Sequence, residues 1–74
     1  MPETTAVSDN VRAEMARARV TQAQLATRLK MSQQALSARL AGRTAWSVTQ
    51  LLAAADVLGV PVSALLPAGT AVAS

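Results

Sequence analysis

The sequence predicts an all-α fold, a compact domain of five short helices, and three observations support this class. Apolar residues make up 51% of the 74 residues, but they are mainly Ala, Leu and Val. Trp46 is the one aromatic residue, so the side chains that favour strands are scarce. Helix-capping pairs and helix-stopping glycines recur along the chain at helical intervals. A chain of this length forms one domain with a modest core.

The first helix is expected to begin at Ser8 or Asp9, because either side chain can act as its N-cap. It should end near Ala18. Val11, Met15 and Ala18 are spaced four and three residues apart, which places them on one inward face of this helix.

Residues 20–42 predict two helices joined by a tight turn. Thr21 is the expected N-cap of the first, with Gln24 completing a capping box, and Ser32 is the expected N-cap of the second. Gly42 provides a left-handed residue that stops the second helix. Because the second helix restarts two or three residues after the first ends, it must cross the first steeply, which is helix-turn-helix geometry.

The same capping pattern returns at Ser47 and Gln50, where Trp46 and Leu51 form a hydrophobic staple. The pattern predicts a helix over residues 48–58 that Gly59 ends. The expected apolar face of this helix consists of Val48, Leu51, Leu52, Ala55 and Leu58.

A last short helix is expected to open at Pro61 and to end at Pro67. Both ends of the chain, residues 1–7 and 67–74, are small or polar and are expected to be disordered. The domain is therefore predicted over residues 8–66. The last helix should bury Val62, Leu65 and Leu66.

Positive charge is concentrated on the central segment. The net charge is +3, and the stretch from Arg17 to Arg43 contains six basic residues and no acid. After Arg43 the only charged side chain is that of Asp56. This distribution indicates an anionic partner for the helix-turn-helix segment.

Composition also excludes several classes of function. The chain has no Cys and no His, and it shows no nucleophile paired with a base, no metal-ligand cluster and no glycine-rich phosphate loop. We therefore expect no enzyme, no metal, no cofactor and no small-molecule substrate. No apolar run approaches the roughly 20 residues of a membrane span, so no membrane partner is expected.

Four stretches resemble the Cro and phage-repressor family of helix-turn-helix DNA-binding domains in their order and spacing. They are TQAQLA at residues 21–26, MSQQAL at 31–36, the Gly42-Arg43 pair, and LLAAADVLGV at 51–60. The resemblance covers residues 11–66. It implies a five-helix fold in which the second and third helices contact DNA.

The resemblance implies that the helix Gln33–Ala41 lies in the major groove, and that Gln22 braces Gln33. A glutamine amide presents a donor and an acceptor together, which matches the edge of adenine. Gln33 and Gln34 would contact bases, Ser37 would add a polar contact and Ala38 would touch a thymine methyl. Arg43, Thr44 and Gln22 would contact phosphates. The candidate DNA-contacting residues are Gln22, Ser32, Gln33, Gln34, Ser37, Ala38, Arg43 and Thr44.

The chain departs from the family pattern at three basic residues. Lys30 stands in the turn, and Arg19 stands at the end of the first helix, where a Gly is usual at both places. A left-handed backbone at Lys30 costs roughly 1 kcal/mol. Arg39 replaces an apolar residue, and we expect its stem to lie on the core while its guanidinium points outward.

Several apolar residues near the C-terminus exceed what one small core needs and predict a dimer contact. A two-fold dimer would place two such helices roughly 34 Å apart on a near-palindromic site. The alternative is that these residues simply fill the core. They are Val57, Val60, Val62, Leu65 and Leu66.

Together these features favour a sequence-specific, double-stranded DNA-binding transcriptional regulator of repressor or Cro type. It would act in the cytoplasm on the nucleoid, or in the host cytoplasm if it is phage-encoded. One alternative is a protein-interaction adaptor that docks through its apolar helices. Another is the DNA-binding part of a longer regulator or of an antitoxin. The alternative for Gln33 and Gln34 is that they are ordinary exposed helix formers with no base contact.

Overall fold

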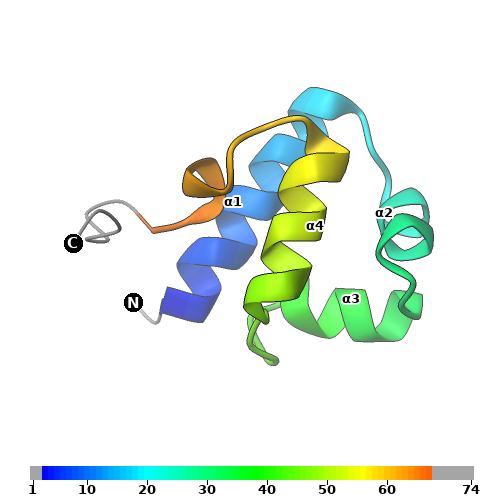
Figure 1. Ribbon diagram of the computed structural model, residues 1–74. Coiled ribbons are helices and arrows are strands. Elements are labelled where there is room, and N and C mark those ends of the chain that lie inside the picture. The colour runs from blue at the N-terminus through cyan, green and yellow to red at the C-terminus, as the bar shows by residue number, and fades with distance from the viewer. Residues whose placement is uncertain (1–2, 68–74) are drawn as a thin grey trace.

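The structure is a computed structural model that describes residues 3–67, and every regular element in that range is helical. This confirms the all-α class. Four of the five expected helices are α-helices, and the last is a 3₁₀ helix. The elements are α1 (Glu3–Ala18), α2 (Gln22–Leu29), α3 (Gln33–Leu40), α4 (Val48–Leu58) and the 3₁₀ helix η1 (Val62–Leu65), as Figure 1 shows.

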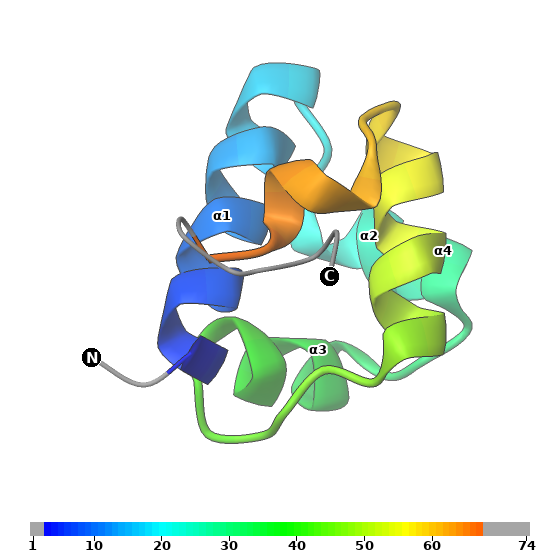
Figure 2. The ribbon, with the colours of Figure 1, turned by 60° about the vertical axis from the view of Figure 1, so that its left-hand side comes forward.

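The helices α1 and α4 form the centre of the fold, and α3 runs across one end of both (Figures 1 and 2). α2 packs against α3 and α4, and η1 packs against α1 and α4. Asn10 of α1 fastens η1, because its Nδ2 donates to the carbonyls of Leu65 and Leu66 at 3.3 and 3.0 Å. The last element is therefore tied to the first.

Each element contributes one side chain with no exposed surface to a single core. They are Val11 of α1, Leu25 of α2, Leu36 of α3, Ala54 of α4 and Leu65 of η1. Burial of a Val or Leu side chain contributes about 1.5–3 kcal/mol relative to leaving it in water. α2 and α3 are therefore held by the same core as α1, α4 and η1.

The start of α1 corrects the expected domain boundary. α1 begins at Glu3, so residues 3–7 are helical rather than disordered, while residues 1 and 2 lie outside the described part. Ser8 is not the N-cap. It lies inside the helix, is buried, and donates its hydroxyl to the carbonyl of Arg39. The expected disordered tail also lies outside the described residues, apart from Pro67.

The inward face of α1 is shifted one turn toward the N-terminus. Val11 and Met15 are buried as expected, but Ala18 is exposed and Val7 is buried instead. Val7, Val11 and Met15 recur every four residues, which is the spacing of one helical face.

The apolar face of α4 is also rotated from the expected one. Val48 is 73% exposed and Leu52 is 53% exposed, whereas Ala54, which was not on the expected face, is fully buried. Ala55 and Leu58 are buried as expected. Leu51 is half-buried and packs against the core, so of the expected face only Val48 and Leu52 are turned outward.

The predicted helix caps are present. The hydroxyls of Thr21 and Ser47 accept the backbone N–H of Gln24 and Gln50 at 3.1 Å, and each glutamine side chain accepts the N–H of its cap residue in return. Both are complete capping boxes. Trp46, next to the second box, is half-buried and packs against the core, as a staple requires.

Left-handed residues stand where the sequence pattern places them. Gly42 and Gly59 have φ of +81° and +72°, and Gly59 is the C-cap of α4. Lys30 and Arg19 are also left-handed, each with φ of +57°. A residue with a side chain costs roughly 1 kcal/mol in this conformation. Both positions where the resemblance expects Gly are therefore left-handed in this chain although they carry basic side chains.

Candidate nucleic-acid interface

An open hollow of about 350 Å³ lies beside the N-terminal half of α3. It brings together five of the eight residues expected to contact DNA, from three separate segments of the chain. One is the first residue of α2, three belong to α3, and one belongs to the loop that follows α3. The lining residues are Gln22, Gln33, Gln34, Ser37 and Arg43.

Ser32 caps the start of α3, and the first two residues of the helix, Gln33 and Gln34, are exposed. The Ser32 hydroxyl accepts the N–H of Ala35 at 3.0 Å, which uses that hydroxyl for the cap. The N–H groups of Gln33 and Gln34 in the first turn have no acceptor inside the helix. They add a partial positive charge to the end of α3 that faces outward.

The glutamine side chains at this end are exposed and unengaged. Within residues 3–67, the amides of Gln22, Gln33 and Gln34 make no hydrogen bond with the protein. Gln22 and Gln33 line the same hollow without a hydrogen bond between them, so the expected bracing stays a prediction. Each amide keeps its donors and acceptor available for a ligand.

Three candidate residues do not line the hollow. Ser32 serves as the cap, and Thr44 is exposed in the loop beyond Arg43. Ala38 is half-buried, and its carbonyl accepts the Arg43 N–H at 2.9 Å. The expected contacts of these three residues with DNA stay predictions.

Backbone hydrogen bonds hold the loop after α3 beside the helix. Besides the bond from Arg43 to Ala38, the N–H of Gly42 donates to the Arg39 carbonyl at 3.0 Å. The left-handed backbone of Gly42 allows the chain to fold back in this way. Arg43 is therefore placed next to Ser37 at the edge of the hollow.

The C-terminal end of α3 is held by side chains whose role the sequence pattern did not reveal. Ser8 donates to the Arg39 carbonyl, and Arg12 Nη2 donates to the Leu40 carbonyl at 2.6 Å. Both groups come from α1, 28 and 31 residues away in the chain. Sequence spacing carries no signal for pairs so far apart, and Arg12 is exposed even though its guanidinium reaches this carbonyl.

Arg39 itself corrects another expectation. It is half-buried, and its guanidinium does not point outward but donates from Nε to Gln50 Oε1 of α4 at 2.9 Å. Its Nη1 also donates to the carbonyl of Ala35 at 3.0 Å. The side chain therefore bridges α3 and α4 and is absent from the hollow.

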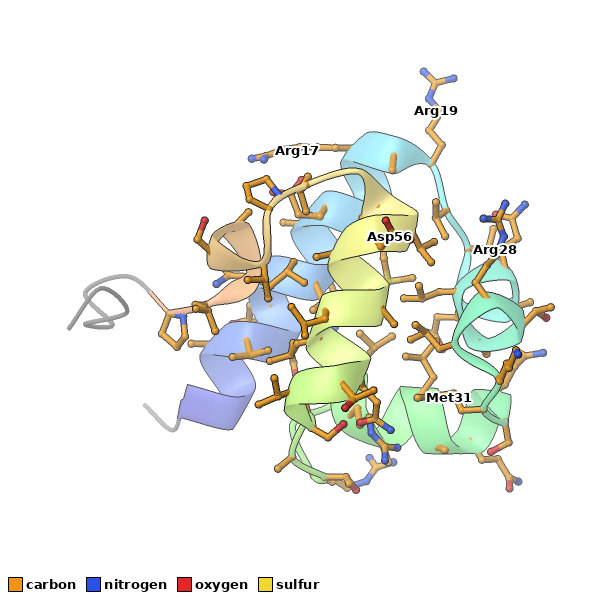
Figure 3. The ribbon with its side chains drawn as sticks, in the orientation of Figure 1. Arg17, Arg19, Arg28, Met31 and Asp56 are labelled. Carbon is orange, nitrogen blue, oxygen red and sulfur yellow. The ribbon has the colours of Figure 1, made fainter. Side chains whose placement is uncertain are left out.

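Most of the positive charge has no acidic partner. In the part of the chain that the structure describes, the one ion pair joins Arg17 and Glu14 at 2.8 Å. Arg19, Arg28 and Lys30 are exposed around α2, and Arg43 is exposed at the hollow. Figure 3 shows Arg19 and Arg28 extending away from the body of the protein. Unpaired cations of this kind attract an anionic partner.

Among residues 3–67, no three His, Cys, Asp or Glu side chains gather in a way that suits a metal ion. No helix in this range combines the length and the apolar character that crossing a membrane requires.

Comparison with known proteins adds one match. The family model described as a helix-turn-helix domain matches residues 7–67, which is most of the chain. No curated protein and no solved structure matches the chain. The matched range contains α2, α3, η1, α4 and every residue that lines the hollow.

Proposed function

Because the chain belongs to the helix-turn-helix domain family, we propose that it is a sequence-specific transcriptional regulator that binds double-stranded DNA. The observation that carries the proposal is the hollow in which Gln22, Gln33, Gln34, Ser37 and Arg43 meet. The resemblance to Cro and phage repressors supports the narrower role of a repressor. Such a role places the chain with the nucleoid, or in the host cytoplasm if it is phage-encoded.

The N-terminal half of α3 supplies the contacts with base edges. An α-helix fits the major groove, and its first residues meet the bases in helix-turn-helix complexes. Gln33 and Gln34 each present a donor and an acceptor that suit adenine, and Ser37 lies one turn further along the hollow. Ala38 follows Ser37 on α3, and we assign it the contact with a thymine methyl.

The phosphate contacts come from residues around the base-contacting helix. Arg43 and Gln22 both line the hollow, and Thr44 follows Arg43 in the chain. Such contacts fix the register of the protein on the duplex but carry no base preference. Affinity should therefore fall steeply as salt rises, with a logarithmic slope of about −0.9 for each phosphate neutralised.

The test begins with enrichment of bound sites from a random duplex pool, followed by titration of selected and scrambled duplexes at two salt concentrations. Gln33→Ala should weaken binding to the selected duplex by about 1–3 kcal/mol and relax the preference at one base pair. Arg43→Ala should weaken both duplexes alike and reduce the salt slope by about 1. Equal losses on both duplexes for Gln33→Ala would contradict the assignment.

We further propose that two copies bind a near-palindromic site. The residues expected at the dimer contact differ in exposure. Leu65 has no exposed surface and fills the core, which corrects its expected place in the contact. Val57, Val60 and Val62 are half-buried against the core and keep part of their surface outside. Leu66 is also half-buried.

Sedimentation with duplexes that carry one or two half-sites tests the dimer. Two half-sites whose centres lie one helical turn apart should bind two copies with higher affinity than two isolated sites. Independent binding at every spacing of the half-sites would contradict the dimer.

One observation favours the alternative of an adaptor that docks a protein partner. Val48 and Leu52 expose apolar surface on α4, outside the hollow. If DNA binding is the main function, Leu52→Glu should leave discrimination between selected and scrambled duplexes unchanged. An adaptor would show no such discrimination in the unaltered chain. Use of the domain within a longer regulator or an antitoxin is compatible with the same DNA contacts.

A further inference from the structure

We propose that Arg39 is a positioning residue that fixes the rotation of α3 about its own axis and thereby sets base preference without touching DNA. The inference rests on the proposed function, because it assigns a role in the recognition of base edges by Gln33 and Gln34. It starts from the observation that the guanidinium turns toward α4 and away from the hollow.

The Arg39 side chain joins α3 to the start of α4. Its Nε donates to Gln50 Oε1 at 2.9 Å, and the same oxygen accepts the Ser47 N–H at 3.1 Å within the capping box. Its Nη1 donates to the carbonyl of Ala35, one turn back on α3, at 3.0 Å. The guanidinium is therefore bonded both to its own helix, α3, and to the capping box at the start of α4.

Side chains of α1 also hold the C-terminal end of α3. Ser8 donates to the Arg39 carbonyl, and Trp46 Nε1 donates to Ser8 Oγ at 3.4 Å. Arg12 Nη2 donates to the Leu40 carbonyl at 2.6 Å. α3 is thus held by α1, by the loop before α4, and by α4 itself.

The apolar contacts of α3 define its rotation less sharply. Its buried side chains are Leu36 and Leu40, four residues apart on one narrow stripe. Hydrophobic burial is non-directional, so these two side chains alone define the rotation less sharply than directional bonds do. Hydrogen bonds weaken steeply with distance and angle, so the bond from Arg39 to Gln50 of α4 resists a turn of α3 about its axis.

A small rotation is enough to change recognition. Side-chain ends lie about 5–6 Å from the axis of an α-helix, so a turn of about 20° moves them by about 2 Å. A displacement of that size breaks a hydrogen bond between an amide and a base edge. It has a weaker effect on phosphate contacts by long, flexible side chains such as that of Arg43.

The experiment uses the full chain and the variants Arg39→Met and Arg39→Lys. Met keeps the length of the stem and removes both hydrogen bonds. Lys keeps the charge but cannot reproduce the two-pronged geometry of a guanidinium. The matched control is Arg28→Met, since Arg28 is exposed on α2 and makes no side-chain hydrogen bond within residues 3–67. Thermal unfolding and titrations with selected, singly substituted and scrambled duplexes are measured for each protein.

For both Arg39 variants we expect the ratio of affinities for selected and scrambled duplexes to fall at least tenfold. Affinity for the scrambled duplex should stay within about twofold, because phosphate contacts are retained. Arg28→Met should leave the ratio unchanged. Titrations are run well below each midpoint of unfolding. Arg39→Lys retains a cation and so keeps the test valid if Arg39→Met does not fold.

Three results would overturn the inference. A lower midpoint of unfolding with an unchanged ratio would show a purely structural role. Equal losses on both duplexes would show that Arg39 contacts phosphate directly. If Arg39→Lys kept the same ratio of affinities for selected and scrambled duplexes as the unaltered chain, charge alone would matter. Absence of discrimination in the unaltered chain is a separate result, seen without any variant, and it would overturn the proposed function together with this inference.

Discussion

The two ends of α3 differ in how the rest of the protein holds them. At the N-terminal end, Gln33 and Gln34 are exposed and their amides have no partner within residues 3–67. At the C-terminal end, the carbonyls of Arg39 and Leu40 accept hydrogen bonds from α1, and the Arg39 side chain binds α4. The eight residues of α3 therefore include an exposed N-terminal end and a C-terminal end that α1 and α4 hold in place, which we call the anchor.

Under the proposed function, this difference separates recognition from stability within one small domain. A binding residue must leave polar groups free for its ligand, and free groups contribute nothing to the folded state. Placing the anchor at the other end of the same helix lets the free end keep a defined position. Substitutions at the C-terminal end should therefore change the free energy of unfolding most, and substitutions of the exposed glutamines at the N-terminal end should act mainly on binding.

The largest effect on stability is expected at the anchored end. Leu40→Ala removes a side chain that is only 3% exposed, so the free energy of unfolding should fall by about 2–5 kcal/mol. Urea unfolding followed by circular dichroism measures the change. The control is Leu52→Ala, which truncates a leucine that is 53% exposed and should cost much less. Equal losses would mean that α3 is not anchored at this end.

The hydrogen bond from α1 should have the next largest effect. Arg12→Met removes the donor to the Leu40 carbonyl, so the free energy of unfolding should fall by about 1.5–3 kcal/mol. Arg17→Met is the matched change on the same helix. Arg17 pairs with Glu14 at the surface, and losing such a pair costs at most about 1 kcal/mol. The difference between the two midpoints in urea decides whether Arg12 belongs to the anchor.

The cap at the open end should matter less. Ser32→Ala removes the acceptor for the Ala35 N–H and should lower the free energy of unfolding by about 1 kcal/mol. Ser37→Ala changes the same residue type inside the helix, where Ala is the better helix former, and should cause no loss. A larger loss at Ser37 than at Ser32 would argue against the cap. Calorimetry of the two variants gives the comparison.

The smallest effect is expected in the turn before α3, where Lys30 has φ of +57°. Lys30→Gly should raise the free energy of unfolding by about 0.5–1 kcal/mol, because glycine adopts this conformation without a clash of Cβ. Lys30→Ala keeps Cβ and should bring no such gain. A stabilising effect of similar size in both variants would mean that strain in the turn is not the cause.

Much of the fold could be predicted because its signals are local. The capping boxes at Thr21 and Ser47 join residues three apart, and the cap at Ser32 has the same spacing. The glycine stop at Gly59 lies next to the helix that it ends. The arrangement of Gln22, Gln33 and Arg43 around one hollow followed from the short turn between two such helices and from family resemblance.

The expectations that the structure corrects failed because they depend on contacts between distant segments, not on local signals. Ser8 looked like a cap because serine suits that position, but α1 continues past it to Glu3 and buries it. Val48 and Leu52 looked buried because they fit an apolar spacing, but α4 is turned so that Ala54 faces the core. In both cases packing between distant segments decided the outcome.

The sequence by itself determined the helices, their caps, their left-handed stops and the basic character of the segment around α2 and α3. Those features depend on hydrogen bonds, steric clashes and charges within a few residues of each other. Only the tertiary structure decided which face of α4 is buried, that Arg39 turns inward, and that Ser8 and Arg12 hold the end of α3. Those contacts join residues 11 to 31 positions apart, and they form only when one shared core brings the helices together.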